Sequence, residues 1–401
     1  MPPRKLIIDT DGAADDIRAI SLALQQPDID VLAITTVQGV VSVQQAVANV
    51  SRALRANQAH VPIYKGAHGP LVKAVSEQNL EWFFGKDGTG DQPEKLPKVL
   101  PKDFENFESN MTAASALIDI MRRHDDVTLV CIGPLTNIAL ALNLDPKFAK
   151  RPKEMVIMGG NVYGVGNIDA KHTAEFNFGA DPEAAYVVLE RMRCPLTIVP
   201  WEATCFEIDD MEGKETDINN HLQLGTPLAD YLSSVTSVCR RHYAKSNKQL
   251  GFVDEVAVAY ALSSDKIVKK HRMLRASVEL SGEYTRHILI AINVVEYILE
   301  INCLHMKMNL ITIDFLFRTV PLPQECNCEQ RLTLHITDFT VYTEHEDELR
   351  CDCLLFDYTG QVACAWSNKS TEDERPLVKF IISYRVELLE EMLRAAVKNS
   401  K

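Results

Sequence analysis

Short apolar runs alternate with helix-like stretches along the first part of the chain, and this alternation constrains the fold more than any other feature. Residues 6–10 and 31–37 are apolar runs of strand length. A helix is expected between them over about 15–25, and a longer one, with apolar side chains at helical spacing, over about 42–56. Strands separated by helices are typical of βαβ units with a parallel sheet. The pattern therefore predicts the α/β class.

The alternation continues toward residue 200. Further apolar runs, separated by helices expected at 135–142 and 181–193, occupy 127–132, 155–158 and 196–200. In a parallel sheet, ligands bind outside the carboxyl ends of the strands. Residues 76–105 form a long polar stretch, and loops of this length often act as lids over sites. We therefore expect one ligand-binding crevice where these strands end.

Charge and composition exclude some classes of partner. The formal net charge is −13, which argues against broad nucleic-acid binding because phosphate contacts need a basic surface. Charged residues interrupt the apolar stretch at 287–317, so a membrane span is not expected. The N-terminal residues lead directly into a short strand and not into an apolar run of signal length, which favours a cytoplasmic protein. The ten cysteines are then expected to be mostly free thiols.

An aspartate cluster follows the first apolar run, with Asp9, Asp11, Asp15 and Asp16 inside one eight-residue segment. Four carboxylates cannot all be buried and charged without a counter-charge. Oxygen ligands of this kind suit Ca²⁺ or Mg²⁺. The alternative is a solvated acidic loop at a helix start, where the helix dipole also favours negative charge. The position directly after a buried strand favours the metal site.

The segment Asp9–Asp16 resembles the N-terminal signature of the inosine–uridine-type nucleoside hydrolases. Further matching segments follow in the family's order across roughly residues 5–286. They are Thr35-Thr36-Val37-Gln38-Gly39, Gly85-Lys86-Asp87-Gly88, Ile132-Gly133-Pro134-Leu135-Thr136-Asn137, Met158-Gly159-Gly160, Ala174-Glu175-Phe176-Asn177, Asp181-Pro182-Glu183-Ala184-Ala185, and Asp254 ahead of Val256-Ala257-Val258-Ala259. The resemblance implies a single α/β domain with a mainly parallel, Rossmann-like central sheet flanked by helices.

The resemblance also implies a reaction, the hydrolysis of the N-glycosidic bond of ribonucleosides to free base and ribose. It implies a Ca²⁺ ion held by Asp11, Asp16, Asp254 and the main-chain carbonyl of Ile132. Asp11 would take a proton from a metal-bound water that attacks C1′, because metal coordination lowers the pKa of water. The substrate would be a small nucleoside, of purine or broader preference, and relatives suggest a homodimer or homotetramer.

The resemblance assigns a second set of residues to the sugar. These are Asp15, Met158, Asn167, Glu175, Asn177 and Asp254. Two of them have a purely structural alternative: Met158 fits a core residue, and Asn167 follows a glycine and fits a turn. Asp254 is the sharpest test of the whole set, because it is distant in sequence and is needed to complete the metal shell.

The chain departs from the family's pattern on the side of the base. Val253 stands where the family often has a histidine that is proposed to protonate the leaving base, and Phe84 and Val40 replace two other polar residues. The alternative function is therefore a catalytically weak or inactive nucleoside- or ribose-binding relative. The residues considered as replacements are His242 and His172 as acids, and Trp82, Phe83, Phe84 or Trp201 as stacking partners.

The last quarter of the chain is atypical. A strand-like block at 278–286 continues in the family's pattern only from residue 360. We therefore expect a core at 1–286, an insertion at 287–359, and a strand and helix within 360–401 that complete the core. The insertion, either an accessory subdomain or a gene-model artefact, holds five of the ten cysteines. Two Cys-x-Cys pairs in it offer a zinc site, although their spacing is unusual.

Overall fold

The computed structural model describes residues 2–73, 79–168, 174–204, 217–281, 289–292, 332–335, 340–343 and 376–400. The chain divides into two compact units, one formed by 1–289 with 375–401 and the other by 290–374. Most of the expected insertion, including its cysteine pairs, lies outside the described residues. Within the second unit, β9 (Leu332–His335) and β10 (Thr340–Thr343) pair in an antiparallel manner.

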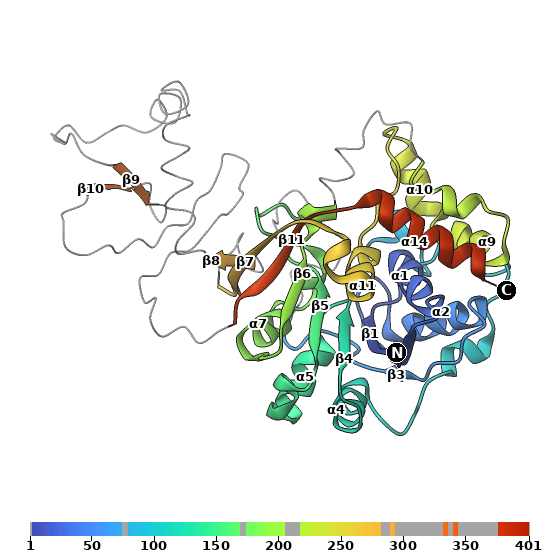
Figure 1. Cartoon of the computed structure of the whole chain (residues 1–401), viewed down its shortest axis with the longest axis horizontal. Helices are drawn as coiled ribbons and strands as arrows, with labels where there is room; N and C mark the ends of the chain where they lie inside the picture. Colours follow the sequence, from blue (N-terminus) through green and yellow to red (C-terminus); the bar gives the residue numbers. More distant parts are fainter. Residues whose placement is uncertain are drawn as a thin grey trace. The chain divides into compact units, whose positions relative to one another are not determined.

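The first unit is built on a mostly parallel sheet (Figure 1), with the strand order β3-β2-β1-β4-β5-β6-β11-β7. Neighbouring strands are parallel, except that β11 and β7 are antiparallel. The strands of the sheet are β1 (Arg4–Thr10), β2 (Ile29–Thr36), β3 (Ile63–Lys65), β4 (Val127–Cys131), β5 (Glu154–Met158), β6 (Leu196–Val199), β7 (Val268–Val278) and β11 (Val378–Tyr384). A further short strand is β8 (Leu289–Ile292). The predicted α/β fold with a parallel, Rossmann-like sheet is confirmed.

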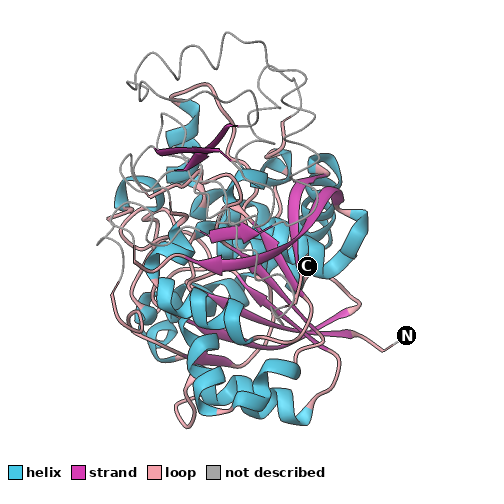
Figure 2. Ribbon diagram, turned by 90° about the vertical axis from the view of Figure 1, so that its left-hand side faces the viewer, coloured by secondary structure: helices cyan, strands magenta, loops and turns pink. Residues whose placement is uncertain are grey.

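Helices flank the sheet (Figure 2). On one side of the sheet, α5 contacts both α4 and α7. On the other side, α1 contacts α2, α9, α11 and α14. The α-helices are α1 (Ala14–Leu24), α2 (Val43–Ala56), α3 (Glu81–Phe84), α4 (Ala113–Arg123), α5 (Thr136–Leu144), α6 (Phe176–Ala180), α7 (Pro182–Arg191), α9 (Pro227–Val235), α10 (Ser237–Ala244), α11 (Asp254–Ser263) and α14 (Val386–Asn399). Within the described part of the chain, the helices are too short or too polar to cross a membrane.

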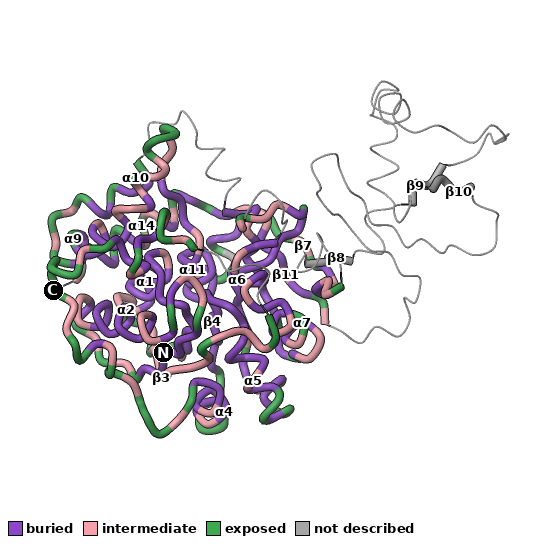
Figure 3. Tube along the Cα trace, turned by 180° about the vertical axis from the view of Figure 1, so that it is seen from behind, coloured by how far each residue is buried: buried purple, intermediate pink, exposed green. Residues whose placement is uncertain are grey.

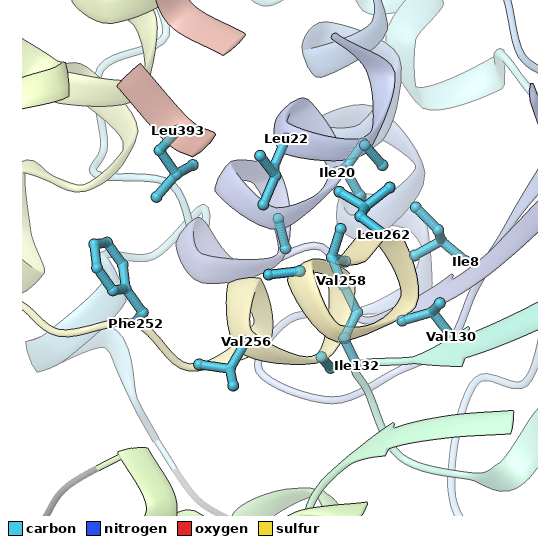
Figure 4. Packing of buried hydrophobic residues seen from close by; sticks show 14 of the residues in the cluster. Ile8, Ile20, Leu22, Val130, Ile132, Phe252, Val256, Val258, Leu262 and Leu393 are labelled. Carbon is cyan, nitrogen blue, oxygen red and sulfur yellow. The ribbon is translucent and has the colours of Figure 1, made fainter. Parts of the chain in front are cut away.

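The helix α11 lies inside the molecule. All its residues from Asp254 to Leu262 are buried, and it contacts β4, β5 and β6 as well as α1 and α14. Figure 4 shows Val258 and Leu262 of α11 near Ile20 of α1, with Val256 on another side of the helix. A helix that is apolar on every side belongs in the interior. Figure 3 shows α11 among the other elements of the first unit. Its first residue, Asp254, is 3% exposed and is therefore held by the core and not by a surface loop.

The C-terminal strand is part of the same sheet. In β11, Val378 lies opposite Leu196 of β6 on one side and opposite Leu274 of β7 on the other. The helix α14 then packs against α1 and α11. A segment that is far away in sequence thus supports the two helices that carry the aspartates.

The long polar stretch at 76–105 contains two short helices within its described part, α3 and the 3₁₀ helix η1 (Pro101–Glu105). The buried side chain of Arg52 on α2 donates hydrogen bonds to the main-chain oxygens of Gln92, Lys95 and Pro97. These bonds hold the second half of the stretch against α2. The first half contains α3, which lies near the carboxyl ends of the strands.

Candidate active site

A cavity of about 250 Å³ opens at the carboxyl ends of the central strands. Asp11 follows β1, Ile132 follows β4, and Met158 ends β5, so three neighbouring strands deliver lining residues to it. The structure brings together around this cavity every residue that the sequence assigned to metal, sugar or catalysis. They are Asp11, Asp15, Asp16, Ile132, Met158, Asn167, Glu175, Asn177 and Asp254.

The turn between β1 and α1 is wrapped around the Asp16 carboxylate. Its Oδ1 accepts hydrogen bonds from the Thr10 hydroxyl and from the Asp11 N–H at 3.2 Å, and its Oδ2 accepts one from the Ala13 N–H at 3.1 Å. Gly12 in this turn has a φ of +74°, a conformation that glycine adopts without cost. The local sequence thus fixes Asp16 before any ligand is bound.

Asp11 is held by the loop that follows the neighbouring strand β2. Its Oδ2 accepts a hydrogen bond of 2.8 Å from the Val40 N–H. Gly39 makes room for this contact, because a Cβ at Gly39 would collide with the Asp11 carboxylate. The Thr35–Gly39 motif therefore matters to the site through its backbone and not through a side chain.

Three carboxylates form a group that suits a metal ion. Asp15, Asp16 and Asp254 each offer an oxygen, and these atoms lie within 4.8 Å of one another. This trio differs from the expected ligand set in two residues. It includes Asp15, which was expected to bind the sugar, and it does not include Asp11, which was expected to bind the metal. The main-chain ligand that was expected, the Ile132 carbonyl, accepts a 3.3 Å hydrogen bond from the Asn177 amide.

Burial makes the charged forms of these groups costly. It raises the pKa of Asp15 to about 7, and neighbouring carboxylates add to the effect. Burial also raises the pKa of Asp11, Asp16 and Asp254. A cluster of hard oxygen donors whose charged forms are disfavoured by burial and by one another fits a divalent cation such as Ca²⁺.

A second polar group lies at the start of α6. The Glu175 carboxylate accepts hydrogen bonds from the N–H groups of Gly160, Asn177 and Phe178, and burial raises its pKa to about 7. The Asn177 amide also donates to the Met158 carbonyl at 3.1 Å. Both side chains are thus fixed by main-chain atoms, as preorganised binding groups are.

Asn167 lies at the edge of the described loop. Its Oδ1 accepts a 2.7 Å hydrogen bond from the Phe176 N–H, which links it to the same helix start. The acid candidate His172 lies outside the described residues.

Another part of the cavity wall is apolar and aromatic. Trp82 and Phe83 of α3 contact His242 of α10, with ring centroids 4.6 and 5.5 Å apart. The other members of this wall are Val40, Leu80, Phe84, Trp201, Tyr243, Leu250 and Val253. His242, one of the two acid candidates, therefore lines the cavity. Sequence reasoning missed Tyr243 and Leu250, which lie outside the motifs.

The comparison with known families decides the identity of the chain. Residues 6–308 match the family described as "Inosine-uridine preferring nucleoside hydrolase". The chain belongs to this family. It is 33% identical over 290 residues to the inosine-uridine preferring nucleoside hydrolase of Leishmania major, which covers 71% of this chain and 86% of that protein. It is 32% identical over 292 residues to uridine nucleosidase 1 of Arabidopsis thaliana, covering 71% and 81% of the two chains.

Solved structures agree with this nucleoside hydrolase assignment. An inosine-guanosine nucleoside hydrolase has a TM-score of 0.69 and 25% identity, with 98% of each chain covered. A purine-preferring ribonucleoside hydrolase from Gardnerella vaginalis has a TM-score of 0.62 and 27% identity, with 72% of this chain and 88% of that chain covered. The predicted resemblance is confirmed, and the chain is an enzyme of the class that hydrolyses N-ribosyl bonds of ribonucleosides.

Proposed function

We propose that this nucleoside hydrolase uses Ca²⁺ to release free base and ribose from ribonucleosides. The observation that carries the proposal is the meeting, around one cavity, of the strand-end aspartates with Asp254 of the buried helix α11. Asp11, Asp16, Asp254 and the Ile132 carbonyl would hold the ion. When bound, the ion supplies counter-charge and Lewis-acid activation of water and of sugar hydroxyls.

One side chain activates the water, and others bind the sugar. Asp11 accepts the proton of the water that attacks C1′, and the Val40 N–H keeps its carboxylate in place. Asp15, Asn167, Glu175 and Asn177 bind ribose hydroxyls. Positive charge develops on the ribose as the bond to the base breaks, and the fixed carboxylates stabilise that charge.

The aromatic wall would receive the base. Rings such as Trp82 and Phe83 bind a flat heterocycle by stacking, which tolerates purines and pyrimidines alike. The named relatives act on inosine, uridine or guanosine, so inosine is the first substrate to test. His242 lies on this wall and is our candidate for the group that gives the leaving base its proton.

The test is a panel of purine and pyrimidine nucleosides, assayed for ribose and free base with Ca²⁺ and with a chelator. We expect turnover of inosine that stops on chelation and returns with added Ca²⁺. Asp11→Asn should remove it, whereas the exposed control Asp30→Asn should not. An absence of turnover with every nucleoside in the presence of Ca²⁺ would overturn the proposal.

One observation favours a second function. Val253 precedes Asp254 with an apolar side chain, so this position cannot protonate a leaving base. The alternative function is then a protein that binds nucleosides without hydrolysing them. Calorimetry would detect Ca²⁺-dependent binding of inosine, while the product assay on the same sample would detect no ribose.

A further inference from the structure

A buried ion pair lies beside the aspartates, and one of its members, Arg18, also lines the cavity. Arg18 of α1 donates from Nε to the carboxylate of Glu255 on α11, and the two side chains are 1% and 0% exposed. In sequence they are 237 residues apart. Arg18 follows Asp16 by two positions and Glu255 follows Asp254 directly. The pair therefore joins the two segments that supply the carboxylates.

Arg18 holds the chain on both sides of Asp254. Its Nη2 donates to the Gly251 carbonyl at 2.6 Å, and its guanidinium lies 5.1 Å from the centre of the Phe252 ring. Glu255 uses its second oxygen to accept a 2.8 Å hydrogen bond from the Val253 N–H. The turn from 251 to 255 is thus fixed to α1 before and after the aspartate that it carries.

Stability alone does not account for this pair. Two buried charges lose their hydration, and apolar replacements of similar size are often neutral or stabilising. The pair Arg55–Asp103 is a useful contrast, because it also has a buried carboxylate but a 29% exposed arginine, and neither residue lines the cavity. What distinguishes Arg18–Glu255 is its place between the two halves of the site.

We propose that Arg18 and Glu255 are positioning residues, whose ion pair fixes Asp254 against Asp15 and Asp16 so that the cation site exists before the cation arrives. This inference rests on the proposed metal-dependent function. The pair has no net charge, so it orients the carboxylates without changing the total charge that attracts the ion. Removing both partners together therefore tests position and not charge.

The experiment uses the double variant Arg18→Met/Glu255→Leu and the matched control Arg55→Met/Asp103→Leu, both in the full chain. Calorimetric titration with Ca²⁺ should give a Kd about 10–100-fold weaker for the first variant, the usual effect of losing groups that support metal ligands. The control should keep the wild-type Kd. A wild-type Kd in Arg18→Met/Glu255→Leu would overturn the proposal.

A second readout does not depend on metal. In the metal-free protein, amide hydrogen exchange of residues 251–255 should be faster in the double variant than in the wild type. Unchanged exchange there contradicts the inference whatever the titration gives. If the wild type binds no Ca²⁺, the proposed function fails, while the exchange result still decides the positioning role.

The single variant Arg18→Lys guards against a double variant that does not fold. It keeps the positive charge, but its one ammonium group cannot reproduce the planar fork that contacts Gly251 and Glu255. We expect weaker Ca²⁺ binding and a loss in kcat larger than the change in KM. Wild-type Ca²⁺ affinity in Arg18→Lys would show that the fork has no positioning role.

Discussion

Two parts of the cavity wall, called here the carboxylate end and the aromatic end, are built in different ways. At the carboxylate end, Asp11, Asp16 and Asp254 are at most 3% exposed, and main-chain N–H groups hold Asp11 and Asp16. At the aromatic end, Trp82 is 60% exposed, and His242 is fixed mainly by ring contacts. The first is held by main-chain groups of the loops that follow β1 and β2, and the second by side chains of the helices α3 and α10.

This difference matches the two tasks of a nucleoside hydrolase. The ribose and the attacking water are the same in every reaction, so the groups that act on them gain from being fixed in advance. The base varies between substrates, and stacking against half-exposed rings accepts different bases. The comparison predicts that changes at the carboxylate end lower turnover of all nucleosides, whereas changes at the aromatic end depend on the leaving group.

The largest effect should come from Asp254→Asn. Removing this charge from the carboxylate end should lower kcat/KM for inosine by about 10³-fold or more, at the upper end of losses seen for one preorganised electrostatic group. Uridine should suffer a similar loss, because the sugar is shared. Steady-state kinetics with the exposed control Asp230→Asn checks this, and a loss of less than tenfold would contradict the division between the two ends.

Removal of metal should destabilise the protein more at high pH than at low pH. Burial raises the pKa of Asp15 and Glu175 from 3.8 and 4.5 to about 7, so between about pH 4 and 7 the folded protein binds more protons than the unfolded chain. Its stability then falls as pH rises through this window, by up to about 1.4 kcal/mol per group and pH unit.

Bound Ca²⁺ replaces those protons as counter-charge. The difference in melting temperature between samples with Ca²⁺ and with chelator should therefore be larger at pH 7.5 than at pH 5. Thermal unfolding followed by circular dichroism measures it. An equal difference at both pH values would mean that the carboxylate end does not hold the ion.

A smaller effect, and one that depends on the leaving group, is expected for His242→Gln. Loss of a proton donor should lower kcat on inosine by about 10²-fold. A nitrophenyl riboside, whose leaving group departs as a stable anion, should be cleaved at the wild-type rate. Arg241→Gln, at an exposed position of the same helix that does not line the cavity, is the control. Equal losses on both substrates would show that His242 acts only by packing.

The fold could be predicted because its signals are local. The apolar run at 6–10 and the helical spacing at 42–56 specify a strand and a helix without reference to the rest of the chain. The place of β11 between β6 and β7 was not contained in any such pattern, since strand order depends on contacts far apart in sequence. The short helix α3, with four residues, is too brief to leave a periodic signal.

The site residues, too, could be predicted only where the signal is local in sequence. Motif matches placed Asp11, Glu175 and Asp254 at one cavity, because each lies in a segment with a recognisable sequence. Arg18 was missed, because an arginine in a helix is normally assigned to solvent. Its burial follows from Glu255, a residue on a different helix that no local pattern connects to it. Pairs of this kind become visible only when the helices are packed.

The smallest effect should come from Trp82→Ala. Because Trp82 is more than half exposed, its ring contributes only part of the energy of a buried aromatic contact. An aromatic pair adds about 0.5–1.5 kcal/mol beyond its buried area, which corresponds to a KM for inosine raised by roughly two- to tenfold. The kcat for inosine should stay near the wild-type value, because the carboxylate end is untouched. Leu96→Ala, a similarly exposed apolar residue that does not line the cavity, serves as the control. A fall in kcat with unchanged KM would mean that the aromatic end takes part in the bond-breaking step and does not merely bind the base.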